Sequence, residues 1–75
     1  MPGQPAAPVI CISVNGEPRE TAAGSRVADL LQTLDLSGRK IAVERNGEIV
    51  PRSQHGQTVL QDGDRLEIVV AVGGG

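Results

Sequence analysis

The sequence predicts an α+β domain in which a mixed sheet of four to five strands carries one helix on one face. Three features indicate this fold: short β-branched segments, two Asn-Gly pairs typical of tight hairpin turns, and one segment with helical spacing of apolar residues. Because a single helix cannot enclose a core by itself, it must cover a face of the sheet. The 75 residues suffice for one small domain.

The composition limits both the core and the possible functions. The chain has no aromatic residue, so Val, Ile and Leu must form the core. Its nine acidic and seven basic residues form no charged block, which argues against electrostatic binding of nucleic acid. Its single cysteine, Cys11, excludes an internal disulfide and indicates a reducing compartment. Since no segment resembles a membrane span or a signal peptide, we expect a cytoplasmic protein.

The chain divides into a leader, a folded domain and a tail. Residues 1–8 hold three of the five prolines and no large apolar residue apart from Met1, which predicts a disordered leader. The folded domain is expected over residues 9–72. Residues 73–75 are three glycines, which predict a flexible tail.

The first two strands are expected to form a hairpin. Residues 9–14 alternate as a half-buried strand does. The side chains facing the core would be Ile10, Ile12 and Val14. Asn15-Gly16 suits a type I′ turn, because both central positions of that turn take positive φ. Residues 18–21 should return at the edge of the sheet, since Pro18 donates no backbone hydrogen bond.

A helix is expected next, with Ser25 as its N-cap. Apolar residues then recur at spacings of three, four and seven, which predicts one apolar helical face. They are Val27, Leu30, Leu31 and Leu34. We expect about two and a half turns, ending near residues 35–38.

The second half of the chain predicts more short strands. A third strand is expected over residues 40–45, followed by a tight turn at Asn46-Gly47 and a short strand over residues 48–50. The connector over residues 52–57 is expected to be irregular, with His55 on the surface.

The last strand begins at Leu66 and is rich in β-branched residues. The side chains predicted to face the helix are Leu66, Ile68, Val70 and Val72. Val69 and Ala71 would then face away, as would Cys11 on the first strand, and form an uncharged docking patch beside the tail. The alternative is that these are ordinary surface residues, with Cys11 acting as a small hydrophobe.

The three terminal glycines support a functional hypothesis. They form a thin, adaptable segment that carries the α-carboxylate away from the folded domain. We therefore expect Gly75 to be a reactive terminus that enters the active site of another protein. The alternative is a frayed end, since chain termini are commonly disordered.

Five segments carry a resemblance to a known family. They are Val14-Asn15-Gly16-Glu17, Val27-Ala28-Asp29-Leu30-Leu31, residues 43–52, Leu60-Gln61-Asp62-Gly63-Asp64 and Val72-Gly73-Gly74-Gly75. From about residue 9 to its end, the chain resembles the ThiS family of sulfur carriers of thiamine thiazole biosynthesis. That family lies within the ubiquitin-like β-grasp superfamily. The resemblance implies that the first and last strands lie side by side, parallel, at the centre of the sheet.

The resemblance also implies a reaction cycle. A ThiF-like activating enzyme would use ATP and Mg to adenylate the Gly75 carboxylate, and a sulfur donor such as a cysteine desulfurase would convert it to a thiocarboxylate. A ThiG-like thiazole synthase would then receive the sulfur. Gly73 and Gly74 would let the tail pass through a narrow channel. The chain itself would be no enzyme, would bind no cofactor, metal or nucleic acid, and would have no membrane partner.

Other functions share this fold and tail. One alternative is the small subunit of molybdopterin synthase (MoaD-like), although that family tends to place a proline before the glycines, where this chain has Val70-Ala71-Val72. A carrier for another sulfur pathway, a ubiquitin-like modifier and an interaction module with an inert tail are the others.

Overall fold

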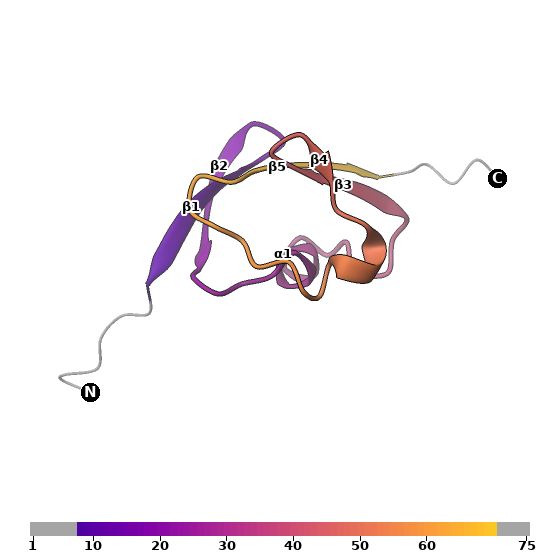
Figure 1. Cartoon of the computed structure of the whole chain (residues 1–75), viewed down its shortest axis with the longest axis horizontal. Helices are drawn as coiled ribbons and strands as arrows, with labels where there is room; N and C mark the ends of the chain where they lie inside the picture. The colour runs from indigo at the N-terminus through magenta and orange to yellow at the C-terminus, as the bar shows by residue number, and fades with distance from the viewer. Residues whose placement is uncertain (1–7, 71–75) are drawn as a thin grey trace.

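A computed structural model describes residues 8–70 of the chain (Figure 1). The elements in order are β1 (Val9–Val14), β2 (Glu17–Ala22), α1 (Val27–Thr33), β3 (Ile41–Arg45), β4 (Glu48–Ile49), the 3₁₀ turn η1 (Arg52–Gln54) and β5 (Arg65–Val70). The predictions for the leader before Pro8, for Ala71 and Val72, and for the three glycines lie outside the described residues.

The five strands form one sheet in the order β2-β1-β5-β3-β4. β1 and β5 run parallel at its centre, while the remaining neighbours pair antiparallel. α1 lies across one face of the sheet, and η1 lies beside it on the same side (Figure 1). This arrangement confirms the predicted α+β fold, the β-grasp strand order and the edge position of the second strand.

Both Asn-Gly pairs form the predicted turns. Asn15 and Gly16 take φ angles of 51° and 86°, and Asn46 and Gly47 take 53° and 85°. Two consecutive positive φ angles define a type I′ turn, whose twist matches that of the flanking strands. The two turns therefore set the register of the β1–β2 and β3–β4 hairpins.

The helix begins one residue later than predicted. Arg26, not Ser25, is the N-cap, with extended backbone angles, and its N–H donates a 2.9 Å hydrogen bond to the Asp29 carboxylate. The carbonyl of Ser25 accepts a 2.8 Å hydrogen bond from the N–H of Leu60, and the N–H of Val27 donates a 3.0 Å hydrogen bond to the carbonyl of Thr58. A long-range backbone pairing thus overrides the local capping preference of serine.

The helix ends at Thr33, just before the predicted end at residues 35–38, and at seven residues it is shorter than expected. Asp35 takes a φ of 61°. The N–H of Leu36 then bonds the carbonyl of Leu31 at 2.8 Å, and the N–H of Asp35 bonds that of Gln32 at 3.0 Å. This pair of bonds is a Schellman motif, which satisfies carbonyls that the helix end leaves unpaired.

The core lies between α1 and the sheet and is built from Val, Ile and Leu, as the composition requires. Its buried members are Ile12, Val27, Leu30, Leu31, Val43, Val50, Leu60, Leu66 and Ile68. The alternation predicts that Val70 is buried as well, and this is wrong, because 38% of Val70 is exposed. β1 ends before it reaches Val70, so that residue lies at the rim of the core.

The predicted surface position of His55 is also wrong. His55 is 8% exposed, and its Nε2 lies 3.1 Å from the carbonyl oxygen of Val50. The carbonyl of His55 in turn accepts a 2.9 Å hydrogen bond from the N–H of Ala28 in α1. The connector after β4 thus packs against the helix. No helix within residues 8–70 has the length and apolar character needed to cross a bilayer.

Three neighbouring aspartate substitutions in β5 test the orientation of this strand. Ile68 is 6% exposed, Val69 63% and Val70 38%. Ile68→Asp buries an unpaired charge and should lower the free energy of unfolding by about 4 kcal/mol or more. Val69→Asp should lower the free energy of unfolding by about 1 kcal/mol, which is the difference in strand propensity between the two residues. Val70→Asp should lower it by an intermediate amount. Urea denaturation followed by circular dichroism measures all three. If Val69→Asp lowers the free energy of unfolding more than Ile68→Asp does, Val69 and not Ile68 faces the core.

Candidate functional site

The candidate site is the end of β5, because the glycine tail follows this strand. β5 lies between β1 and β3, so its position is fixed from both sides. Two groups of side-chain hydrogen bonds add to the backbone pairing. One lies at the start of the strand and the other near its end.

Asp64 organises the start of β5. It is 4% exposed, and its Oδ2 accepts hydrogen bonds from Arg45 Nε at 2.7 Å and from the N–H of Gln61 at 2.8 Å. Its Oδ1 accepts a third from Asn46 Nδ2 at 3.0 Å. The Asn46 Oδ1 accepts a bond from the N–H of Arg65 at 2.9 Å. These bonds join the β3–β4 turn to the first residue of β5.

Two opposing effects act on the ionisation of Asp64. Burial raises the pKa of its carboxyl, whereas the hydrogen bonds from Arg45, Gln61 and Asn46, together with the Arg45 charge, lower it. The result is a pKa below the ordinary value of 3.8. The folded protein therefore holds Asp64 as a carboxylate, the form that accepts all three bonds.

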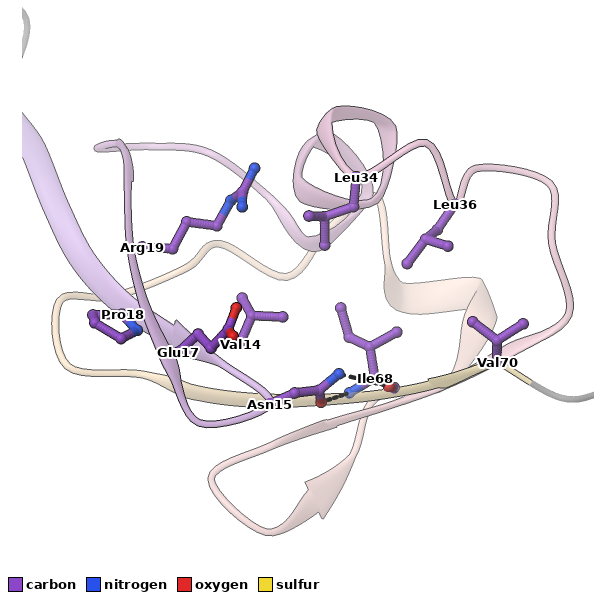
Figure 2. Close-up of a pocket in the computed structure, with 9 residues that line it drawn as sticks. All are labelled: Val14, Asn15, Glu17, Pro18, Arg19, Leu34, Leu36, Ile68 and Val70. Atoms are coloured by element: carbon purple, nitrogen blue, oxygen red, sulfur yellow. Dashed lines mark hydrogen bonds between the residues drawn. The ribbon is translucent and has the colours of Figure 1, made fainter.

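Asn15 fixes β5 near its other end. Beyond the last residue of β1, the Asn15 side chain pairs with the backbone of Ile68: Nδ2 donates to the carbonyl at 3.1 Å, and Oδ1 accepts from the N–H at 2.8 Å (Figure 2). The backbone N–H of Asn15 donates to the carbonyl of Leu66 at 2.9 Å. The side-chain amide thus takes the place of one further peptide unit of β1. The sequence predicts Asn15 as a turn residue and gives no sign of this second role.

The hydrogen-bonding edge of β5 remains open past Asn15. Successive residues of a strand direct their backbone N–H and C=O groups to opposite sides. Leu66 and Ile68 direct theirs toward β1 and Asn15, so Val70 does the same. Within residues 8–70 no group pairs with the backbone of Val70 on that side.

A groove of about 450 Å³ lies beside this open edge. Val70, Ile68, Leu34 and Leu36 supply apolar walls, and the β1–β2 hairpin closes the other side (Figure 2). Figure 2 shows the side chains of Leu34 and Leu36 directed from the end of α1 toward β5. The groove exists because the seven-residue helix stops before it covers this end of the sheet.

The structure separates the residues predicted to form one docking patch. Val69 is 63% exposed and Cys11 is also exposed, as expected. In the parallel register, however, Cys11 lies beside Gly63, whose N–H donates a 2.8 Å hydrogen bond to the Cys11 carbonyl. Cys11 lies two residues before Ser13, which pairs with Arg65, and Val69 lies four residues after Arg65. These six positions along the strands separate Cys11 from Val69 by about 20 Å at 3.3 Å per residue. The neighbour of Val69 is instead Ala42 of β3. The other predicted patch residue, Ala71, lies outside the described residues.

The described residues include no group of three or more His, Cys, Asp or Glu side chains placed to hold a metal ion. What they define is a β-grasp domain whose central strand leads directly into a glycine tail.

The chain belongs to the ThiS family, whose model matches residues 12–75. It is 38% identical over 64 residues to the sulfur carrier protein ThiS of Escherichia coli K12, and the match covers 85% of this chain and 97% of that protein. A crystal structure of ThiS from Geobacter metallireducens superposes with a TM-score of 0.75 at 33% identity, covering 88% of this chain and all of that one. This likeness confirms the predicted β-grasp fold.

Longer proteins also contain a similar segment. The chain is 52% identical over 62 residues to a protein of Paramagnetospirillum magneticum named thiazole synthase, in a match that covers 83% of this chain but 19% of that protein. A thiazole synthase of Magnetococcus marinus is 44% identical over 64 residues, with 20% of its length covered. The chain therefore spans about a fifth of these two relatives.

The low pKa of Asp64 predicts how stability depends on pH. A carboxyl whose pKa is lower in the folded state stabilises the fold above its unfolded pKa, near 3.9, and loses that contribution as pH falls through the folded value. Asp64→Asn should therefore lower the free energy of unfolding by about 2 kcal/mol at pH 7. The difference in free energy of unfolding between this variant and the unmodified protein should become smaller below about pH 4.

Urea denaturation at pH 7, 5 and 3 measures this difference, with Glu67→Gln as the control because Glu67 is exposed. A gap that stays constant across the three pH values would contradict the role given to the Asp64 carboxylate.

Proposed function

We propose that this protein is a sulfur carrier for thiamine thiazole formation. In this proposal the C-terminal carboxylate of Gly75 is adenylated, converted to a thiocarboxylate and used as the sulfur source of a thiazole synthase. The observation that carries the proposal is the family match, which runs through the three glycines to residue 75. The E. coli and G. metallireducens relatives of similar length carry the ThiS name.

The chemistry explains why an activating enzyme is needed. A carboxylate is ionised at neutral pH and is a poor electrophile. Transfer of the adenylyl group of ATP to the Gly75 carboxylate expels pyrophosphate and leaves an acyl-adenylate. A sulfur nucleophile at the oxidation level of sulfide then attacks the acyl carbon, AMP leaves, and the thiocarboxylate remains. We infer that the activating enzyme binds ATP and Mg, and that this chain is a protein co-substrate of that enzyme with no catalysis of its own.

The position of β5 suits this role. The strand is fixed by pairing on both sides up to Asn15 and Ile68, whereas the backbone of Val70 beyond them is unpaired within the described chain. A partner can therefore bind the start of the tail by backbone hydrogen bonds, as extended peptides bind at sheet edges. Glycines at positions 73 to 75 add no side chain that would obstruct a narrow channel.

The proposed partners are a ThiF-like activating enzyme, a sulfur donor such as a cysteine desulfurase, and a ThiG-like thiazole synthase, all in the cytoplasm. Two relatives named thiazole synthase support the last of these, because a segment similar to this chain forms part of each. We place the docking surface at exposed Val69 and at the groove beside Val70, with Ala71 continuing toward the tail. Cys11 lies in the middle of β1, beside Gly63 and far from Val69, and is left out of this surface.

Deletion of Gly74 and Gly75 tests the role of the tail. Glycines bury no apolar side chain, so the deletion should leave the melting temperature nearly unchanged. It should abolish the exchange of labelled pyrophosphate into ATP catalysed by the activating enzyme of the same host. Deletion of Pro2 and Gly3, two residues at the other end, is the matched control and should retain exchange. A tail-deleted protein that supports exchange at the control rate would contradict the proposal.

A second experiment tests whether the carrier supplies sulfur to thiazole synthesis or to molybdopterin synthesis. One thiocarboxylate preparation is supplied to a thiazole synthase from the same host and to the large subunit of a molybdopterin synthase. We expect sulfur transfer in the first reaction. Molybdopterin formation without thiazole formation would assign the carrier to the other pathway while leaving the Gly75 chemistry intact.

A further inference from the structure

A second cavity, of about 300 Å³, lies on the side of α1 that faces η1. It is lined by one face of α1, the loop that follows the helix, the start of β3, η1 and the turn after η1. The residues that matter below are Leu31, Leu36, Arg39, Ile41, Arg52 and His55. None of the residues that line the cavity is Asp or Glu.

The two arginines of this cavity are available to a ligand. Within residues 8–70, the ion pair joins Arg45 to Asp64. In the same part of the chain, Arg39 and Arg52 form no ion pair with a carboxylate. Their guanidinium groups each carry five N–H donors. The chain as a whole has a net charge of −2, so the charge of this cavity is opposite in sign to that of the molecule.

His55 supplies a fixed polar group to the same cavity. It is 8% exposed, and because a carbonyl can only accept, Nε2 donates to the Val50 carbonyl at 3.1 Å. No buried side-chain nitrogen or oxygen in the described residues lacks a hydrogen-bond partner. Nδ1 has no hydrogen-bond partner in the described part of the chain, and His55 is one of the residues that line this cavity.

The rest of the wall is apolar. Leu31, Leu36 and Ile41 also line the cavity. Ile41 pairs with Val70, so the cavity lies at the same end of the sheet as the last described residue of β5. A volume of 300 Å³ exceeds that of a single oxyanion and leaves room for a short carbon chain.

We propose that this cavity binds a phosphate monoester. The phosphate oxygens accept hydrogen bonds from Arg39 and Arg52, whose planar guanidinium groups match phosphate geometry. The carbon part of the ligand lies against Leu31, Leu36 and Ile41, and the imidazole of His55 lines the same cavity. This site is separate from the carboxylate chemistry of Gly75, and its test requires neither the activating enzyme nor the thiazole synthase.

Amide and ring-nitrogen NMR titrations of the full chain test the proposal. The probes are n-butyl phosphate, inorganic phosphate and butanoate, each compared with sodium chloride at equal ionic strength. We expect saturable shifts at the Gly38 and Gly56 amides and at His55 Nδ1 with both phosphates, and tighter binding of the butyl ester. Butanoate that binds as tightly as butyl phosphate would overturn the assignment to phosphate, and shifts that are unsaturable or spread over the surface would overturn the site.

Two double variants test whether Arg39 and Arg52 provide the binding energy for butyl phosphate. Arg39→Gln with Arg52→Gln should raise the Kd for butyl phosphate by about tenfold or more, the loss of a charge-assisted bidentate contact. Arg19→Gln with Arg65→Gln removes the same net charge elsewhere and should change the Kd by about twofold or less. All four arginines have side chains outside the core, so both proteins should keep their amide spectra. Equal losses in the two double variants would show a diffuse electrostatic effect and overturn the proposal.

Discussion

The pairing of β5 with both of its neighbours is the constraint on which this small domain depends. β5 contributes the buried side chains of Leu66 and Ile68 and leads to the tail. The Asp64 carboxylate joins its start to the β3–β4 turn, and the Asn15 amide continues the edge of β1 up to Ile68. Without aromatic residues the core has few large side chains to position the strand, so these polar contacts define where the tail begins.

The short helix determines which surfaces remain open at that end. α1 covers the middle of the sheet and ends at the Schellman motif around Asp35. The groove beside Val70 and the arginine-lined cavity lie on either side of the chain that leaves the helix, and Leu36 borders both. A longer helix would fill this space with side chains. The length of the helix thus leaves concave surfaces next to the segment that partners are proposed to bind.

Features that depend on residues close in the chain could be predicted from the sequence, whereas features that depend on contacts between distant segments could not. The Asn-Gly turns, the strand alternation and the apolar helix face were predictable because each depends on residues close in the chain. The position of His55 and the N-cap at Arg26 were not, since the backbone pairings of His55 with Ala28 and of Ser25 with Leu60 join residues distant in sequence. Docking at Val69, Ala71 and Cys11 stays a prediction, but the sequence could not show the distance between these residues, because no turn fixes the β1–β5 register that places Cys11 about 20 Å from Val69 at 3.3 Å per residue. The strand order itself came from the family resemblance.

The state of Gly75 in the cell is the most direct test of the central claim, that this chain carries sulfur on its terminal carboxylate. The measurement is the intact mass of the protein purified from its native host without reducing or alkylating agents, followed by fragmentation to locate any change. The account predicts a fraction whose mass is raised by the replacement of one oxygen by one sulfur, located at Gly75. A protein found entirely as the free carboxylate while the host is making thiamine, or joined through Gly75 to lysines of other proteins, would contradict it.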